Sequence, residues 1–156
     1  MAAAAPYRRV LVGTDGSETA SAAVRHAAGL ARVTGAELVV VTAYTTDPLH
    51  ERQLADERDQ APEDVRWMIT DVGEAEDRLV GAKRIAADEG VAHVRTRSEE
   101  GAPAPVLIDA AQELLADVIV VGNRGMAGAG RFLLGSVPNK VSHHAPCDVL
   151  IVHTTG

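Results

Sequence analysis

Short runs of apolar residues alternate along the chain with longer segments in which apolar residues recur every three or four positions. The runs are typical of strands buried on both faces, and the recurrence is typical of helices with one buried face. The expected strands cover residues 9–13, 37–43, 91–97, 117–122 and 148–153. The expected helices begin near Ser17, Val65, Pro103 and Gly135. This order predicts a parallel sheet with right-handed crossovers and helices on both faces.

The first two expected helices have recognisable ends and inner faces. Ser17 is a suitable N-cap for the first, Glu18 is favourable in its first turn, and Gly35 is a typical stop signal. The second runs from Val65 to Gly90. Its apolar face comprises Met68, Val72, Ala75, Leu79, Ala82 and Ala86.

Two segments depart from the simple pattern of buried strand and helix. The strand expected at 91–97 has polar residues on one face, so we place it at an edge of the sheet. The stretch from Tyr44 to Pro62 is polar, highly charged and interrupted by Pro48. We expect this stretch to be a loop, with no more regular structure than a helical turn.

Length and composition favour one core. A chain of 156 residues, 46% of them hydrophobic, suits a single domain over residues 1–156 with a disordered end at 1–6. Aromatic residues make up only 3% of the chain. We therefore expect a core of valine, isoleucine, leucine and alanine, in which small side chains let helices pack closely on the sheet.

The overall charge restricts the partners that the protein can attract. A formal net charge of −7 supplies no broad positive field, so we expect no binding to nucleic acid or to an anionic membrane. The first residues lack the pattern of a secretion signal, and no segment reaches the roughly 18 apolar residues of a membrane span. Cys147 is the single cysteine and cannot form an intrachain disulfide. Together these features predict a cytoplasmic protein.

The segment after the expected fourth strand is rich in glycine. It contains Gly122, Gly125, Gly128 and Gly130. Small residues let a backbone turn its N–H groups toward an anion, and the helix that opens at Gly135 and Ser136 adds N–H groups and the positive end of its dipole. Arg124 and Arg131 either add positive charge or point to solvent. This loop is the best candidate in the sequence for an anion site.

Common phosphate, catalytic and metal motifs do not fit the chain. Residues 130–136 have the glycine spacing of a Walker loop but lack its lysine, and Leu133 replaces the last glycine of a dinucleotide fingerprint. Ser136 lacks the nucleophile-elbow spacing and an evident acid partner, so we expect no catalytic residue. The histidines show no spacing typical of a metal site, so we expect no structural metal.

The glycine spacing does match a known signature. Two glycines three positions apart, Gly122 and Gly125, are followed by residues 126–134 and then by Gly135-Ser136. This pattern resembles the nucleotide-binding signature of the universal stress protein family, in its ATP-binding branch. The resemblance covers nearly the whole chain, from the opening Val-Leu-Val-Gly-Thr-Asp-Gly-Ser to the closing Pro-Cys-Asp-Val-Leu-Ile-Val.

The resemblance implies an open five-stranded parallel sheet of order 3-2-1-4-5, a Rossmann-like α/β fold. It also implies that the glycine loop holds ribose and phosphates, while adenine lies near the ends of the first two strands. The nucleotide-binding residues predicted in this way are Gly13, Thr14, Asp15, Ala43, Gly122, Asn123, Arg124, Gly125, Gly128, Gly135, Ser136 and Val137. For Asp15, capping of the first helix is an alternative role that its position equally allows.

Three functions are compatible with this site. The resemblance implies a stress-response regulator or sensor that binds ATP with little or no turnover. Cyclic AMP is an alternative ligand, because the missing Walker lysine weakens the case for a triphosphate. Slow ATP hydrolysis with magnesium on the phosphates is the third hypothesis, although the sequence shows no general base. The downstream protein partner is left open by the sequence.

The last expected strand is too apolar for an exposed edge. It contains Val149, Leu150, Ile151 and Val152. An exposed edge of this kind invites uncontrolled pairing, which is avoided when the strand pairs with its copy in a second chain. The family resemblance implies homodimers joined in this way, and we therefore predict a two-fold dimer.

Overall fold

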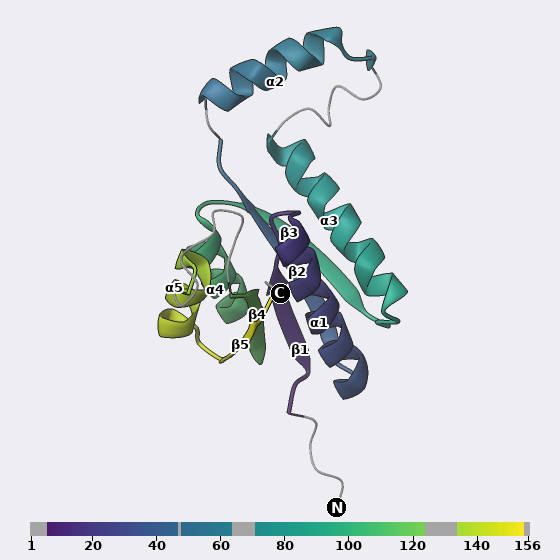
Figure 1. The fold of residues 1–156 in the computed structure, drawn as a ribbon, viewed down its shortest axis with the longest axis vertical. Coiled ribbons are helices and arrows are strands. Elements are labelled where there is room, and N and C mark those ends of the chain that lie inside the picture. Colours follow the sequence, from purple (N-terminus) through teal and green to yellow (C-terminus); the bar gives the residue numbers. More distant parts are fainter. Residues whose placement is uncertain (1–5, 47, 64–70, 124–133, 155–156) are drawn as a thin grey trace, which may run out of the picture.

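The computed structural model describes residues 6–46, 48–63, 71–123 and 134–154 of the chain. The strands are β1 (Arg9–Gly13), β2 (Glu37–Tyr44), β3 (Val94–Glu100), β4 (Val118–Gly122) and β5 (Asp148–Val152). The helices are α1 (Glu18–Thr34), α2 (Pro48–Gln60), α3 (Asp71–Asp88), α4 (Pro103–Glu113) and α5 (Ser136–His144). The strands form one parallel sheet in the order β3-β2-β1-β4-β5, which confirms the predicted fold (Figure 1).

Helices cover both faces of this sheet and create two cores (Figure 1). Successive residues of a strand point to opposite faces, so Val10 and Val12 of β1 contribute to the core under α1 and α3. Leu11 contributes to the other core, under α4 and α5. In the described part of the chain, the buried hydrophobic side chains are all valine, leucine, isoleucine or alanine, as predicted. No described helix is both long and apolar enough to cross a membrane.

The predicted helix signals operate as expected. The Ser17 hydroxyl accepts a hydrogen bond from the N–H of Ala20 at 3.2 Å, which caps α1. Gly35 follows the helix with a φ of 70°, a left-handed conformation that glycine adopts without strain. Helices α4 and α5 begin at Pro103 and Ser136, where the sequence places their first turns.

The prediction of a loop between Tyr44 and Pro62 is wrong, because Pro48–Gln60 forms helix α2. Leu54 is 3% exposed, whereas Leu49 is 68% exposed, so the leucines give no repeating apolar face from which to recognise the helix. Its leucine, arginine, glutamine, alanine and glutamate residues are nevertheless good helix formers, and Pro48 suits the first position. The helix lies beyond the end of β2 and the start of α3 (Figure 1).

The third strand is at the edge of the sheet, as predicted, but it begins at Val94 rather than at Val91. The Val91 N–H donates to the Ala86 carbonyl at 3.2 Å, and Gly90 has a φ of 81°. Both features belong to the end of α3, so the predicted start of the strand is wrong by the length of this helix cap. The predicted end of this strand at Arg97 is also wrong, because β3 continues to Glu100. The boundaries of the other four strands agree with the prediction to within one residue.

The inner face of α3 also differs from the prediction at its start. Val72 is 48% exposed, whereas Asp71 is 7% exposed. The buried positions Ala75 and Leu79 continue a four-residue spacing that leads back to Asp71 rather than to Val72. The predicted Val65 and Met68 lie outside the described residues.

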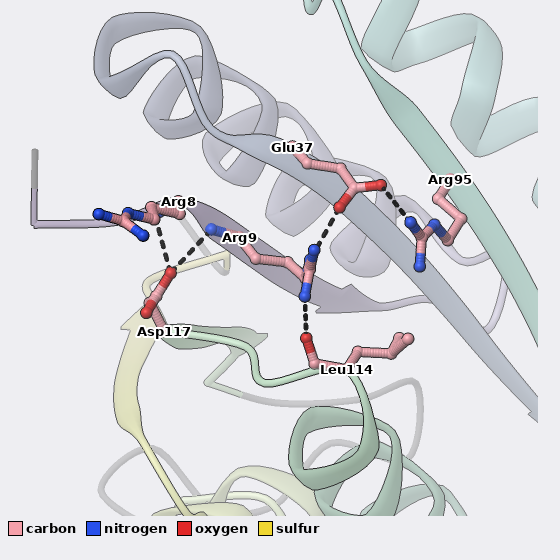
Figure 2. A network of polar contacts seen from close by, with 6 residues as sticks. All are labelled: Arg8, Arg9, Glu37, Arg95, Leu114 and Asp117. Carbon is pink, nitrogen blue, oxygen red and sulfur yellow. Dashed lines mark hydrogen bonds and ion pairs between the residues drawn. The ribbon is translucent and has the colours of Figure 1, made fainter.

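Charged residues close the amino-terminal end of the sheet (Figure 2). Oδ2 of Asp117 accepts hydrogen bonds from the backbone N–H groups of Arg8 at 2.7 Å and Arg9 at 2.8 Å. The Glu37 carboxylate pairs with the side chains of Arg9 at 2.8 Å and Arg95 at 3.0 Å. This network joins β1, β2, β3 and the start of β4 at the end opposite the glycine loop.

Candidate functional site

The predicted binding residues of the described chain lie at the carboxyl end of the sheet. Gly13 ends β1, Gly122 ends β4, and Ala43 is near the end of β2. The chain passes from β1 to β2 on one side, whereas β4 and β5 lie on the other, so the strand order reverses between β1 and β4. Open parallel sheets bind ligands at such a point. The predicted Arg124, Gly125 and Gly128 lie outside the described residues.

Thr14 anchors the loop after β1. Its N–H donates to the Val41 carbonyl at 2.9 Å, and its own carbonyl accepts a hydrogen bond from the Thr42 hydroxyl at 2.7 Å. The Thr14 hydroxyl accepts from the N–H of Gly16 at 3.1 Å. Because Thr14 is buried and Thr42 is fully buried, these bonds fix the backbone that presents Asp15 to solvent.

Asp15 does not take the alternative role of capping α1, because Ser17 is the N-cap of that helix. Oδ1 of Asp15 instead accepts a hydrogen bond from the Ser17 N–H at 2.9 Å, which stabilises the turn before α1. Asp15 is exposed and is thus accessible to a ligand. The next residue, Gly16, has a φ of 81°, and a Cβ there would lie 3.0 Å from Cγ of Arg78.

Arg78 is a basic residue beside the site that sequence reasoning did not select. It comes from α3, far along the chain from the loop after β1, and its aliphatic part lies against Gly16. The helical periodicity of α3 puts Arg78 outside the apolar face, but periodicity alone cannot show which loop it meets. The contact between α1 and α3 on one face of the sheet brings it there.

Gly13 has a packing role in addition to its predicted place in the site. A Cβ at this position would lie 2.9 Å from both terminal methyl groups of Leu107 in α4. Real Cβ atoms do not approach other carbons so closely, and Leu107 is 4% exposed in the core. The glycine therefore lets α4 pack against the end of β1.

Asn123 holds the base of the glycine loop. Its N–H donates to the Val152 carbonyl at 2.8 Å, and its carbonyl accepts from the Gly135 N–H at 3.0 Å. Its Oδ1 accepts from the N–H of Thr154 at 2.9 Å and from the hydroxyl of the same residue at 3.0 Å. These bonds bring the first and last parts of the loop together and tie them to the segment after β5.

The start of α5 faces this base. Gly135 is the N-cap, Ser136 is exposed at the first helical position, and the first turn contains no acidic residue. The first N–H groups of a helix have no partner within the helix, and the helix dipole favours an anion there. Val137 packs into the core under α4 and α5, so its side chain is structural.

Tyr7, Cys147 and Arg97 have raised pKa values, and they lie at the amino-terminal end of the sheet or along β3. The hydrogen bond from the Tyr7 hydroxyl to Asp148 raises the pKa of Tyr7, and burial raises the pKa of the Cys147 thiol. The ion pair with Glu113 raises the pKa of Arg97. The described part of the candidate site is instead built from backbone groups, hydroxyls and the Asp15 carboxylate, a composition suited to binding a polar ligand.

Comparison with known proteins extends this description. The universal stress protein family model matches residues 6–153. A universal stress protein of Mycobacterium tuberculosis is 40% identical over 149 residues, covering 96% of this chain and 98% of that protein. A universal stress protein solved in complex with cAMP has a TM-score of 0.71 at 34% identity, with 96% of this chain and 98% of that chain covered. A universal stress protein of Archaeoglobus fulgidus in complex with dAMP has a TM-score of 0.62 at 25% identity, with 93% and 97% covered. The chain therefore belongs to the universal stress protein family.

Proposed function

We propose that this protein binds an adenine nucleotide at the carboxyl end of the sheet, with ATP as the leading ligand. The observation that carries the proposal is the base of the glycine loop, where Asn123 and Gly135 are hydrogen-bonded at the start of α5. This arrangement brings the first N–H groups of α5, which have no partner within the helix, to the carboxyl end of β4. The cAMP and dAMP complexes of two related proteins support the adenine class.

In this proposal, phosphates and ribose lie against the loop and the start of α5, and adenine lies near the ends of β1 and β2. The proposed contact residues are Gly13, Thr14, Asp15, Ala43, Gly122, Asn123, Arg124, Gly125, Gly128, Gly135, Ser136 and Val137. We add Arg78, whose side chain lies against the Gly16 turn and whose guanidinium can supply positive charge that the acidic chain lacks.

Cyclic AMP is the second candidate ligand. The relative solved with cAMP is 34% identical to this chain over nearly its full length. A monophosphate also needs less positive charge than a triphosphate, in agreement with the missing Walker lysine. If ATP is the ligand, magnesium would accompany the phosphates.

The same proposal makes the protein a stress-response sensor rather than an efficient enzyme. A nucleotide that binds the folded loop better than the open one stabilises one conformation and can alter a partner surface without being consumed. Slow hydrolysis of ATP is the alternative. We place this activity in a single cytoplasmic domain over residues 1–156.

We further propose that the working unit is a homodimer joined through β5. This strand is at the edge of the sheet, where Leu150 is 41% exposed and Ile151 is 38% exposed. Val149 is partly buried against the core under α5, and Val152 is 5% exposed. Pairing of two β5 strands would cover the exposed leucine and isoleucine and complete their backbone hydrogen bonds.

Calorimetry with ATP, ADP, AMP and cyclic AMP, with and without magnesium, tests the ligand class. We expect Gly122→Val and Gly135→Val each to weaken binding at least tenfold, about 1.4 kcal/mol, because a side chain obstructs the close approach of phosphate to backbone. Gly81→Val is the matched control, since a Cβ at Gly81 meets nothing within 4 Å. Wild-type affinity in both loop variants, or no binding of any adenylate at millimolar concentration, would overturn the proposal. Release of phosphate over hours would favour slow hydrolysis.

A further inference from the structure

Three side chains capable of binding a metal ion converge where α2 meets α3. His50 is in the first turn of α2, and Asp71 and Glu74 are in the first turn of α3. Nε2 of His50 lies 3.5 Å from Oδ1 of Asp71 and 3.4 Å from Oε2 of Glu74. One ligand atom from each residue lies within 4.8 Å of the other two. Residue spacing in the sequence does not predict this cluster. His50 is far from Asp71 and Glu74 along the chain, and it belongs to a segment expected to be a loop.

The separations between these atoms suit a shared ion. Metal bonds to imidazole nitrogen and carboxylate oxygen are about 2.1 Å long, which puts neighbouring ligands of a tetrahedral site about 3.4 Å apart. The two distances from His50 already have this length. The Glu74 side chain is 39% exposed and can adjust its position, whereas that of Asp71 is 8% exposed and fixed by burial.

The charges of the cluster also favour a cation. Asp71 is buried, and Glu74 brings a second carboxylate close to it. Two carboxylates near one another repel. A divalent ion held by all three groups would neutralise both of them.

We propose that His50, Asp71 and Glu74 bind a divalent transition-metal ion, with Zn²⁺ the preferred ion, and that this ion fastens α2 to α3. One nitrogen and two oxygen ligands suit zinc, whereas magnesium prefers oxygen ligands alone. The half-exposed His50 and Glu74 leave a fourth position open to water. This site is separate from the glycine loop and from any magnesium ion carried by a nucleotide.

The experiment uses the full chain, freed of metal with a chelator and titrated with ZnCl₂ or MgCl₂ in competition with a chromophoric chelator. We expect one strongly bound zinc per chain and no comparable binding of magnesium. His50→Ala and Glu74→Gln should each weaken zinc binding more than tenfold, because each removes one of three ligands. Both side chains are partly exposed, so circular dichroism should show that the variants stay folded. Cobalt substitution gives a second readout, since its visible absorption reports the ligand geometry.

His26→Ala is the matched control, because His26 is an exposed histidine on α1 that contacts only its own helix through the Ala22 carbonyl among the hydrogen bonds described. It should bind zinc like the wild type. The proposal is overturned if the wild type binds no stoichiometric zinc at micromolar concentration, if His50→Ala binds it normally, or if His26→Ala loses it equally. Loss of stability in His50→Ala without any zinc binding would identify a simple ion pair instead. Calorimetry with ATP on the same variants keeps this result distinct from the nucleotide proposal.

Discussion

The two ends of the sheet use their polar groups in different ways. At the amino-terminal end, Asp117 and Glu37 accept hydrogen bonds from arginine side chains and backbone, and Arg9 also donates to the Leu114 carbonyl (Figure 2). At the carboxyl end, hydroxyl and backbone groups hold the loops in place, and Asp15 is exposed. The difference teaches that charged groups secure the strands at one end of the sheet, whereas the loops of the proposed binding site lie at the other end.

The comparison makes separate predictions for stability and binding. Residues of the amino-terminal network should change the free energy of unfolding without changing nucleotide affinity. Residues at the carboxyl end should change affinity, except where they also pack into a core. The following experiments test this division in order of expected effect.

Gly13→Val should have the largest effect on stability. Its Cβ would lie 2.9 Å from the Leu107 methyl groups, and overpacking of a core costs about 2 kcal/mol in the free energy of unfolding. Urea denaturation measures this cost. Leu107→Ala in the same chain should recover part of it by making room for the valine. A Gly13→Val protein as stable as the wild type would show that α4 does not require this glycine.

Asp117→Ala should lower the free energy of unfolding by about 1 to 2 kcal/mol, because two backbone N–H groups lose their acceptor. Asp117→Asn, which retains an oxygen acceptor, should lose less. Urea denaturation and ATP calorimetry on both variants provide the measurements. Nucleotide affinity should stay within about twofold of the wild type. The reason is that Asp117 lies at the end of the sheet opposite the proposed binding site. A tenfold loss of affinity would contradict the claim that the amino-terminal network affects stability but not nucleotide binding.

Thr42→Val should affect both properties on a smaller scale. The variant loses the buried hydrogen bond to the Thr14 carbonyl, worth about 1 kcal/mol, and releases the turn that presents Asp15. Thr42→Ser keeps the hydroxyl and is the matched control. We expect calorimetry to show weaker ATP binding for the valine variant alone. Equal affinity in both variants would show that Thr14 is not part of the binding site.

The smallest expected effect concerns Cys147, just before β5 at the amino-terminal end. Burial raises the pKa of its thiol, so at a given alkaline pH less thiolate is present than in the unfolded chain. Alkylation by iodoacetamide should therefore be slower in the folded protein, with its pH midpoint displaced upward relative to the protein in urea. A midpoint at or below the unfolded one would show that this region is more open than the structure indicates.

The sequence predicts the sheet and most helices because each has a strong local signal. Valine-rich runs mark β1, β2 and β4, and Ser17 and Gly35 mark the ends of α1. Helix α2 escapes prediction because its attachment depends on isolated contacts, such as those of Leu54 and His50, rather than on a repeated apolar face. Local patterns cannot show a contact between segments that meet only in three dimensions.

The candidate site follows the same rule. Glycine spacing identifies the loop, and the resemblance assigns residues to the ends of β1 and β2. The sequence gives no sign that Asn123 bonds to Gly135 and Thr154, or that Arg78 lies against Gly16. These contacts depend on the way the helices and the final segment fold back over the sheet, which spacing does not encode.

The most direct test of the central claim is an amide NMR titration of the full chain with ATP. Shifts should concentrate at the carboxyl end, in Thr14, Asp15, Gly122 and the first turn of α5, while the amides of Arg8 and Arg9 stay in place. Shifts gathered at the amino-terminal end, or none with millimolar nucleotide, would contradict the account.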